Sequence, residues 1–492
     1  MYFRPLAALG ALCLVACGVQ PAREPAPAAD APPSQQASVA PAECPRAASL
    51  DPKLVSEELV CLLRQYIQID TTNPPGNELV AAQFLKRVLA REGIDAQLIE
   101  SAPGRANLIA RLPGKSRGPA LMLMHHMDVV PASAEEWSVP PLSATVKEGR
   151  VWGRGSLDNK GGGTAELLAV LLAKRLGVAL ERDVVLLAVA DEESGGGVGA
   201  RWLVEKHPEL FEDVGLILNE GGGILELPGG NLLYTVEIAQ KAPLWLRVTA
   251  RGASGHGSAP SPSAASAVLV RALARLADHH FPIVVLPEVQ AVFSARVPSM
   301  PEAQRASYSQ LDKALKDAAF RRQFEQDPHD AALVHNTLAI TMLSGSNKEN
   351  VISERASAVL DLRLLPGQDP ELVTRELRAL MAEPSLEVET LLSWKAYRSS
   401  KDTPLFAAIE RLAHARHPNA PVAANVIGGF TDCNAFRAHD KTCYGFLPMQ
   451  ITLDDIGRIH GKDERIGIDA LTDAVLALHA LVNDLQGAAP AP

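Results

Sequence analysis

The sequence has no block of basic residues and no internal repeat, and its 47 Lys and Arg are outnumbered by 57 Asp and Glu. A net charge of −10 without a basic patch argues against nucleic acid as a partner, because phosphate recognition needs clustered cations. The chain is rich in apolar residues instead. Of its 492 residues 47% are hydrophobic, which is enough for large cores in two or more domains.

The amino terminus contains an apolar segment that is too short to span a bilayer. A basic start at 1–4 precedes the apolar residues 5–14, a pattern typical of an export signal. Leu-Val-Ala-Cys at 14–17 resembles the lipobox of bacterial lipoproteins, and Gly18 replaces the aspartate associated with inner-membrane retention. We therefore expect a signal peptide over 1–16 and a lipid on Cys17. The protein would be exported and anchored to the bacterial cell envelope, on the periplasmic side at the outer membrane. A plain secretory signal is the alternative.

Cysteine is scarce, with six residues in the whole chain. Cys13 would leave with the signal and Cys17 would carry the lipid, which leaves Cys44, Cys61, Cys433 and Cys443. Outside the cytoplasm four cysteines allow three pairings, of which Cys44–Cys61 and Cys433–Cys443 are the simplest. Buried free thiols are the alternative. The Pro- and Ala-rich residues 17–48 have no periodic apolar pattern, and we predict a disordered tether there.

The pattern of apolar residues predicts an α/β catalytic domain over 49–241. Strand-like runs at 106–111, 120–124, 183–190 and 214–218 alternate with helical spacing at 54–69, 78–91, 162–176 and around 201–206. The order becomes βαββαβ over 242–392, with a polar helical insertion near 306–326. We therefore expect a smaller α+β, ferredoxin-like domain inserted into the first. The catalytic domain resumes over 393–485 and a tail follows at 486–492.

Acidic residues and histidines follow several of these runs. The strand that starts at 120 ends in His125, His126 and, two residues on, Asp128. Because alternate residues of an extended chain share a face, His126 could bind a metal while Asp128 holds its other nitrogen. The remaining candidates are Asp158, Glu192, Glu193, Glu220 and His460, which we place just past the carboxyl ends of strands. Singly each could be a solvated residue, but together these N and O donors suit a two-zinc hydrolytic site.

Five segments carry a family resemblance: 153–161, 191–196, 219–222, 254–258 and 459–461. In this order they resemble the dizinc metallopeptidase family of aminoacylase, acetylornithine deacetylase, succinyl-diaminopimelate desuccinylase and carboxypeptidase S. The carboxypeptidase S branch is the most similar. The resemblance implies a catalytic domain with a mixed sheet between helices, interrupted by a lid and dimerisation domain.

The resemblance also implies residue roles and a cofactor. Asp158 would bridge two zinc ions per subunit, for which Co²⁺ or Mn²⁺ could substitute. His126 and Glu220 would complete one set of ligands, and Glu193 and His460 the other. Glu192 would be the general acid and base, and Asp128 the partner of His126.

Three residues of the inserted domain complete the set. His256 would reach the zinc site of the partner subunit in a homodimer. Asn350 and Arg363 match positions that bind the substrate carboxylate in some relatives, although Arg363 could instead pair with Asp361. Two residues depart from the family pattern: His125 stands where glycine is usual, which leaves a ligand swap open, and Phe430 interrupts a Gly-Gly-Thr-Asp segment.

These observations predict a hydrolase that cleaves an amide next to a free carboxylate, in small peptides or N-acyl amino acids. A narrow deacylase of the acetylornithine type is the alternative enzyme, and export argues against it because a biosynthetic step belongs in the cytoplasm. A non-catalytic binding lipoprotein would require a missing ligand or base, and none is missing.

Overall fold

The computed structural model describes residues 43–115 and 118–486. The predicted signal, Cys17, most of the tether and residues 487–492 lie outside the described residues. Within the described ranges, no helix is both long and apolar enough to cross a membrane.

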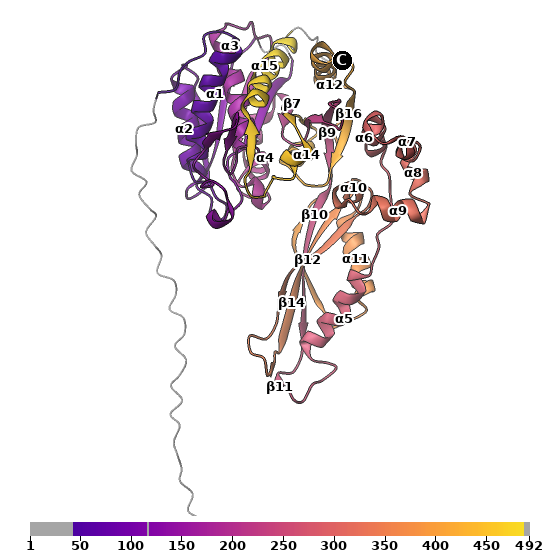
Figure 1. Ribbon diagram of the computed structural model, residues 1–492. Coiled ribbons are helices and arrows are strands. Elements are labelled where there is room, and N and C mark those ends of the chain that lie inside the picture. The colour runs from indigo at the N-terminus through magenta and orange to yellow at the C-terminus, as the bar shows by residue number, and fades with distance from the viewer. Residues whose placement is uncertain (1–42, 116–117, 487–492) are drawn as a thin grey trace, which may run out of the picture. The chain divides into compact units, whose positions relative to one another are not determined.

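The largest sheet of the described residues is mixed and has ten strands (Figure 1). Its order is β1-β2-β6-β3-β7-β17-β9-β8-β18, and β16 pairs with β9. The strands are β1 (Ala96–Ala102), β2 (Arg105–Leu112), β3 (Ala120–His126), β6 (Val184–Val189), β7 (Val214–Asn219), β8 (Gly223–Glu226), β9 (Leu232–Gln240), β16 (Val422–Ile427), β17 (Thr442–Gly445) and β18 (Gln450–Ile451). Strands β3, β6 and β7 are parallel neighbours. Their continuous apolar runs fit strands that are covered on both faces.

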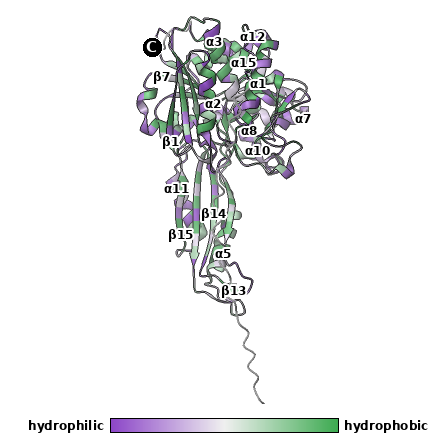
Figure 2. Cartoon of the chain, turned by 90° about the vertical axis from the view of Figure 1, so that its left-hand side faces the viewer, coloured by the Kyte–Doolittle hydropathy of each residue, from purple (hydrophilic) through white to green (hydrophobic). Residues whose placement is uncertain are grey.

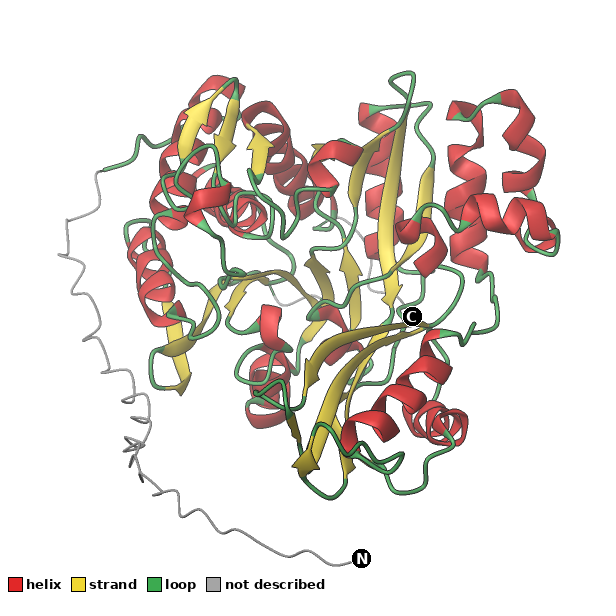
Figure 3. Ribbon diagram, turned by 60° about the horizontal axis from the view of Figure 1, so that its bottom comes forward, coloured by secondary structure: helices red, strands yellow, loops and turns green. Residues whose placement is uncertain are grey.

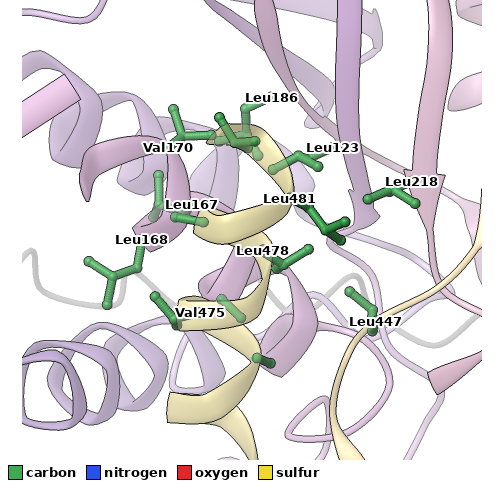
Figure 4. Close-up of a cluster of buried hydrophobic side chains, with 14 of the residues drawn as sticks. Leu123, Leu167, Leu168, Val170, Leu186, Leu218, Leu447, Val475, Leu478 and Leu481 are labelled. Atoms are coloured by element: carbon green, nitrogen blue, oxygen red, sulfur yellow. The ribbon is translucent and has the colours of Figure 1, made fainter. Parts of the chain in front are cut away.

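Helices cover the two faces of this sheet. A core that includes Leu123, Leu167 and Leu478 joins β3 to α3 and α15 (Figure 4). A second core, around Met122 and Phe436, lies on the other face. The helices of this region are α1 (Pro52–Ile67), α2 (Glu78–Ala90), α3 (Lys160–Arg175), α4 (Ala200–Lys206), α12 (Pro404–Arg416), α13 (Cys433–Arg437), α14 (Leu453–Ile456) and α15 (Ile468–Asp484), with 3₁₀ turns at Ala134–Glu136, Glu192–Ser194 and Pro208–Phe211. A small sheet of β4 (Thr145–Lys147), β5 (Arg150–Trp152) and β19 (Arg465–Gly467) lies apart from the large one.

The inserted segment forms a separate antiparallel sheet, which we call the small domain together with its helices. Its strands are β10 (Ala242–Arg251), β12 (Thr337–Ser344), β14 (Arg355–Leu364) and β15 (Glu387–Ser393), in the order β12-β14-β10-β15. Helices α5 (Ala265–Ala277) and α11 (Pro370–Met381) share its core (Figure 3). Along β14, buried residues alternate with more exposed ones. Figure 2 shows hydrophobic and hydrophilic residues alternating along the strands of this sheet. The predicted α/β fold with a ferredoxin-like insertion is confirmed.

A run of helices between α5 and β12 packs elsewhere. It consists of α6 (Pro287–Arg296), a 3₁₀ turn at Val297–Ser299, α7 (Glu302–Ser309), α8 (Leu311–Ala314), α9 (Ala318–Phe324) and α10 (Pro328–Ala332). Phe293 and Phe324 share a core with Ala239 of β9 and Val426 of β16. These helices therefore lie against the large sheet, although their residues fall within the range 242–392 that we expect to form one inserted domain.

Both predicted disulfides are confirmed. Cys44 bonds to Cys61, which ties the segment before α1 to that helix. Cys433 bonds to Cys443, which ties the start of α13 to β17.

Candidate metal centre

Five of the predicted ligands come together in two groups that share one carboxylate. His126, Asp158 and Glu220 form one group, and Asp158, Glu193 and His460 form the other, with the donor atoms of each group within 4.8 Å of one another. The His126 Nε2 atom lies 2.9 Å from Asp158 Oδ1 and 3.4 Å from Glu220 Oε2. The His460 Nε2 atom lies 3.2 Å from Asp158 Oδ2 and 3.1 Å from Glu193 Oε2. Asp158 thus presents one oxygen to each group.

The five side chains come from five separate segments. His126 is the last residue of β3, Glu220 follows β7, and Glu193 lies in the 3₁₀ turn after β6. Because these strands are parallel neighbours, their carboxyl ends meet at one edge of the sheet. Asp158 instead lies in the turn before α3, and His460 follows the short helix α14. Our expectation that every ligand follows a strand is therefore wrong for these two residues.

The donor set fits cations on chemical grounds. Carboxylate and imidazole donors suit zinc and related divalent ions. Burial raises the pKa of Glu193 and of Glu220, so each carboxylate carries its charge at a cost unless a cation neutralises it. The Glu193 Oε1 atom is buried and has no hydrogen-bond partner among the described residues. A buried carboxylate oxygen without a partner is the position where a metal ion would supply the missing contact.

Glu192 lies beside the two groups without belonging to either. It is 6% exposed, and burial together with the negative charge of Glu220 raises its pKa well above the usual range. A carboxyl group with a raised pKa can both take up and release a proton at moderate pH. This position suits the predicted general acid and base.

Asp128 acts mainly on the loop that follows β6. Its carboxylate accepts hydrogen bonds from the backbone N–H groups of Glu192 and Glu193, at 3.1 and 3.2 Å. The Nδ1 atom of His126 is 3.0 Å from the backbone carbonyl oxygen of Asp128 and 3.6 Å from its carboxylate. The expected carboxylate bond to His126 is therefore replaced by a backbone contact, since 3.6 Å is too long for a hydrogen bond.

A network that the sequence did not indicate extends from Asp128. Asn73 donates to the carboxylates of Asp128 and Asp191, at 2.8 and 3.1 Å. Arg105 donates to Asp191 at 3.0 Å and is itself paired with the buried Glu78. Asp191 has a left-handed backbone, φ 68°, immediately before Glu192. Its three side-chain contacts, which include the N–H of Val198, hold this strained residue in place.

His125 lies outside both donor groups. Neighbouring residues of a strand point to opposite faces, so His125 points away from His126. Its Nδ1 atom lies 3.0 Å from Glu166 and its Nε2 atom 3.3 Å from the Tyr66 hydroxyl. Gly163 of α3 leaves room for the ring, because a Cβ there would lie 2.1 Å from it. The imidazole is buried, which lowers its pKa to about 3 and keeps it neutral.

The predicted residues of the small domain are not part of the cluster. His256 lies in the two-residue strand β11 (Gly255–His256), is exposed, and bonds to the hydroxyl of Ser258. Asn350 is exposed just before β13 (Val351–Ile352), which pairs with β11. Arg363 forms two bonds with Asp361, at 2.9 and 3.1 Å, and its guanidinium lies 5.0 Å from the ring of Phe430. The structure therefore contains the Asp361 pairing that was the alternative to substrate binding by Arg363.

The fold and the paired donor groups define a hydrolase of the metallopeptidase class. The chain belongs to peptidase family M20/M25/M40, whose sequence profile matches residues 122–484.

Several known proteins are similar to this chain. An N-fatty-acyl-amino acid synthase/hydrolase of Xenopus tropicalis is 29% identical over 71% of this chain and 69% of its own length. Aminoacylase-1 of Sus scrofa is 27% identical over 85% of this chain and 95% of its own length. The crystal structure of an M20 metallo-carboxypeptidase from Sulfolobus solfataricus superimposes with a TM-score of 0.69 at 21% identity, covering 87% of this chain and 99% of that one. The last similarity concerns the fold.

Proposed function

We propose that this protein is a two-zinc amidohydrolase that cleaves small peptides or N-acyl amino acids with a free carboxylate. The observation that carries the proposal is the pair of donor groups that share Asp158 next to the buried Glu192. Two relatives support N-acyl amino acids as the substrate class, since one is named for N-fatty-acyl-amino acids and the other is an aminoacylase.

The chain's own residues divide the work of the reaction. His126, Glu193, Glu220 and His460, with Asp158 between them, would hold the two ions. Zinc held by these donors would supply Lewis acidity, which would lower the pKa of water and polarise the scissile carbonyl. Glu192 takes the proton of the attacking water and returns it to the leaving amine. The Asp128 and Asp191 contacts keep the Glu192 backbone in place while this happens.

The proposal includes a homodimer formed through the small domain. Strand β12 lies at the end of its sheet, and its residues Met342 and Leu343 are 65% and 70% exposed. An edge strand with exposed apolar residues favours pairing with a second chain. His256 is exposed on the same domain and would complete the partner's site by donating to the oxygen that gains charge.

We also propose export and lipid anchoring through Cys17. Two disulfides among the described residues support an oxidising compartment outside the cytoplasm. Replacement of Cys17 by serine should abolish incorporation of labelled fatty acid and release the protein from membranes. Unchanged membrane association of unlabelled protein would contradict the anchor without affecting the catalytic proposal.

The substrate class can be tested with a panel of dipeptides and N-acyl amino acids. Each compound would be paired with its carboxamide, which lacks the free carboxylate, and assayed before and after metal removal and with added Zn²⁺, Co²⁺ or Mn²⁺. We expect hydrolysis of the compounds with a free carboxylate and only weak hydrolysis of their carboxamide analogues. Activity lost on metal removal should recover when metal is added. Hydrolysis of one acetylated amino acid alone would favour a narrow deacylase instead.

A further inference from the structure

A buried ion pair lies behind one of the two donor groups. Arg154 Nη1 and Glu464 Oε2 are 2.6 Å apart, and their side chains are 3% and 0% exposed. The two residues are 310 positions apart in the sequence. Arg154 follows β5 and Glu464 precedes β19, and these strands are paired.

The pair holds the backbone of two ligand-bearing loops at once. Glu464 accepts the N–H groups of Leu157 and Asp158 at 2.7 and 3.0 Å, and that of Gly155 at 3.1 Å. Arg154 donates from Nη2 to the carbonyl oxygens of His460 and Gly461, at 3.2 and 3.0 Å. The loop of Asp158 and the loop of His460 are thus fixed to each other through one guanidinium and one carboxylate.

The other three ligands do not depend on this pair. Asp128 accepts the backbone N–H of Glu193, while His126 and Glu220 lie at the ends of two central strands. His460 is the ligand with the weakest support of its own. It lies in a loop, has φ 60°, and its side chain is 54% exposed. Besides Arg154, a side-chain contact between Ser138 and Asp463 anchors this loop, at 2.7 Å.

Stability alone is a weak reason for such a pair. Taking two charges out of water costs about as much as their attraction returns, and apolar side chains of similar volume often replace buried ion pairs without loss. An apolar pair, however, could not satisfy three backbone N–H groups and two carbonyls on the two loops. The pair is therefore suited to fixing the positions of the two loops that carry Asp158 and His460.

We propose that Arg154 and Glu464 are positioning residues that set the affinity of the metal ion held by Asp158, Glu193 and His460. This inference rests on the proposed function, in which both donor groups bind metal. Groups that orient metal ligands typically change metal affinity by about 10–100-fold when they are removed. The loss of affinity should affect this ion more than the other. The ion at His126 and Glu220 keeps two ligands whose positions do not depend on Arg154 or Glu464.

The test is a calorimetric titration of the metal-free protein with Zn²⁺. We would compare wild type with the double variant Arg154→Met/Glu464→Gln, which removes both charges together. The matched control is Arg175→Met/Glu58→Gln, a largely buried pair at 2.6 Å with side chains 11% and 3% exposed, which joins α3 to α1 and lies away from the ligand loops. Circular dichroism would confirm that each variant is folded.

We expect wild type to bind two ions and the double variant to bind one of them about 10–100-fold more weakly. The control variant should leave both affinities unchanged, whatever its effect on the melting temperature. Arg154→Lys should show an intermediate loss, because an ammonium cannot reach Glu464 and two carbonyls at once. This variant also serves as the test if the double variant does not fold.

Two outcomes would overturn the inference while leaving the proposed function intact. One is unchanged binding of both ions by the double variant, and the other is equal weakening of both. If wild type itself binds no metal, the proposed function fails together with the inference.

Discussion

The large sheet and the small domain both carry residues assigned to the reaction, but they hold them in different ways. His126 ends strand β3, and the other four ligands and Glu192 lie in loops or turns held by side-chain contacts, among them the bonds from Asn73 and Arg105 to Asp191. His256 and Asn350 are exposed on a short two-stranded ribbon of the small domain. The candidate metal ligands are therefore brought together within one chain, whereas His256 and Asn350 belong to neither donor group.

This difference separates two kinds of function. Hydrogen bonds from surrounding groups orient the ligands of a metal centre, although His460 is half-exposed and has less of this support. Groups that contact only the substrate can be brought in later by domain motion or by a second chain. Substitutions around the donor groups of the large sheet should therefore change metal content or the chemical step. Substitutions in the small domain should leave metal content intact.

The largest effect should come from Glu192→Gln. This change keeps the shape of the side chain but removes its proton-carrying role, so kcat should fall by about 10²–10⁴ with metal content nearly unchanged. Glu193→Gln is the matched control, because it removes a proposed ligand and should lower metal content. Measuring the activity of both variants, and their metal content by atomic emission, would distinguish proton transfer by Glu192 from metal binding by Glu193. Metal loss in the first variant and an active, metal-loaded second variant would mean that the two glutamates are assigned the wrong way round.

His256→Ala should lower kcat by about 10²–10³ without loss of metal, since it removes one donor to the developing oxyanion. Ser258→Ala is the control for the local contact, and should have little effect. Mixing His256→Ala with Glu192→Gln should restore part of the activity, because one site of the hybrid dimer has both wild-type residues. Tagged chains would show that subunits exchange. Confirmed exchange with an inactive mixture would exclude action across the interface.

Metal binding by the donor group of Asp158, Glu193 and His460 should depend on pH. Hydrogen bonds to Asp158 and Glu193 raise the pKa of His460 from 6.5 to about 10, so in the metal-free protein the imidazole is protonated at neutral pH. The stabilisation from this raised pKa is fully present below 6.5 and is lost as the pH rises through about 10. A metal ion must displace the proton, so zinc affinity should increase up to about tenfold per pH unit for each proton released. Calorimetry in buffers of different ionisation enthalpy would count those protons, and no release would contradict the assignment of His460.

The smallest effect is expected for Arg363→Lys in the small domain. Lysine keeps the charge but cannot form the two-pronged bond to a carboxylate, so KM should rise by about tenfold with kcat nearly unchanged. The effect should disappear for a carboxamide substrate. An equal change in KM for both substrates would indicate that Arg363 serves only the pair with Asp361.

The sequence predicted strands with a clear apolar pattern, whether continuous as in β3 or alternating as in β14, and missed strands that are short or have no regular pattern. Strands β3 and β6 are continuous apolar runs and were predictable from that alone. Strand β17 has only four residues, and Asn425 interrupts the apolar residues of β16, whose burial follows no regular period, so neither strand has a distinct periodicity. The insertion is predicted to be helical, but its packing on the large sheet depends on a core shared by Phe293 and Val426 that no local pattern reveals.

The candidate site shows the same limit. Its ligands were found because acids and histidines at the ends of apolar runs are unusual and because their motifs resemble a family. Arg154 lies inside one of these motifs but had no role of its own assigned, and Asn73, Arg105 and Glu464 gave no such signal. Their partners are far away in the sequence, 118 positions in the case of Asn73 and Asp191. Such contacts exist only once the fold has brought the segments together.

The most direct test of the account is a titration of the metal-free enzyme with zinc, with hydrolysis of an N-acyl amino acid measured at each point. The two donor groups predict no activity without metal and a rise that saturates at about two equivalents per chain. Glu192→Gln, titrated in parallel, should bind the same amount of zinc and remain nearly inactive. Full hydrolysis by protein verified to be metal-free would contradict the proposed mechanism.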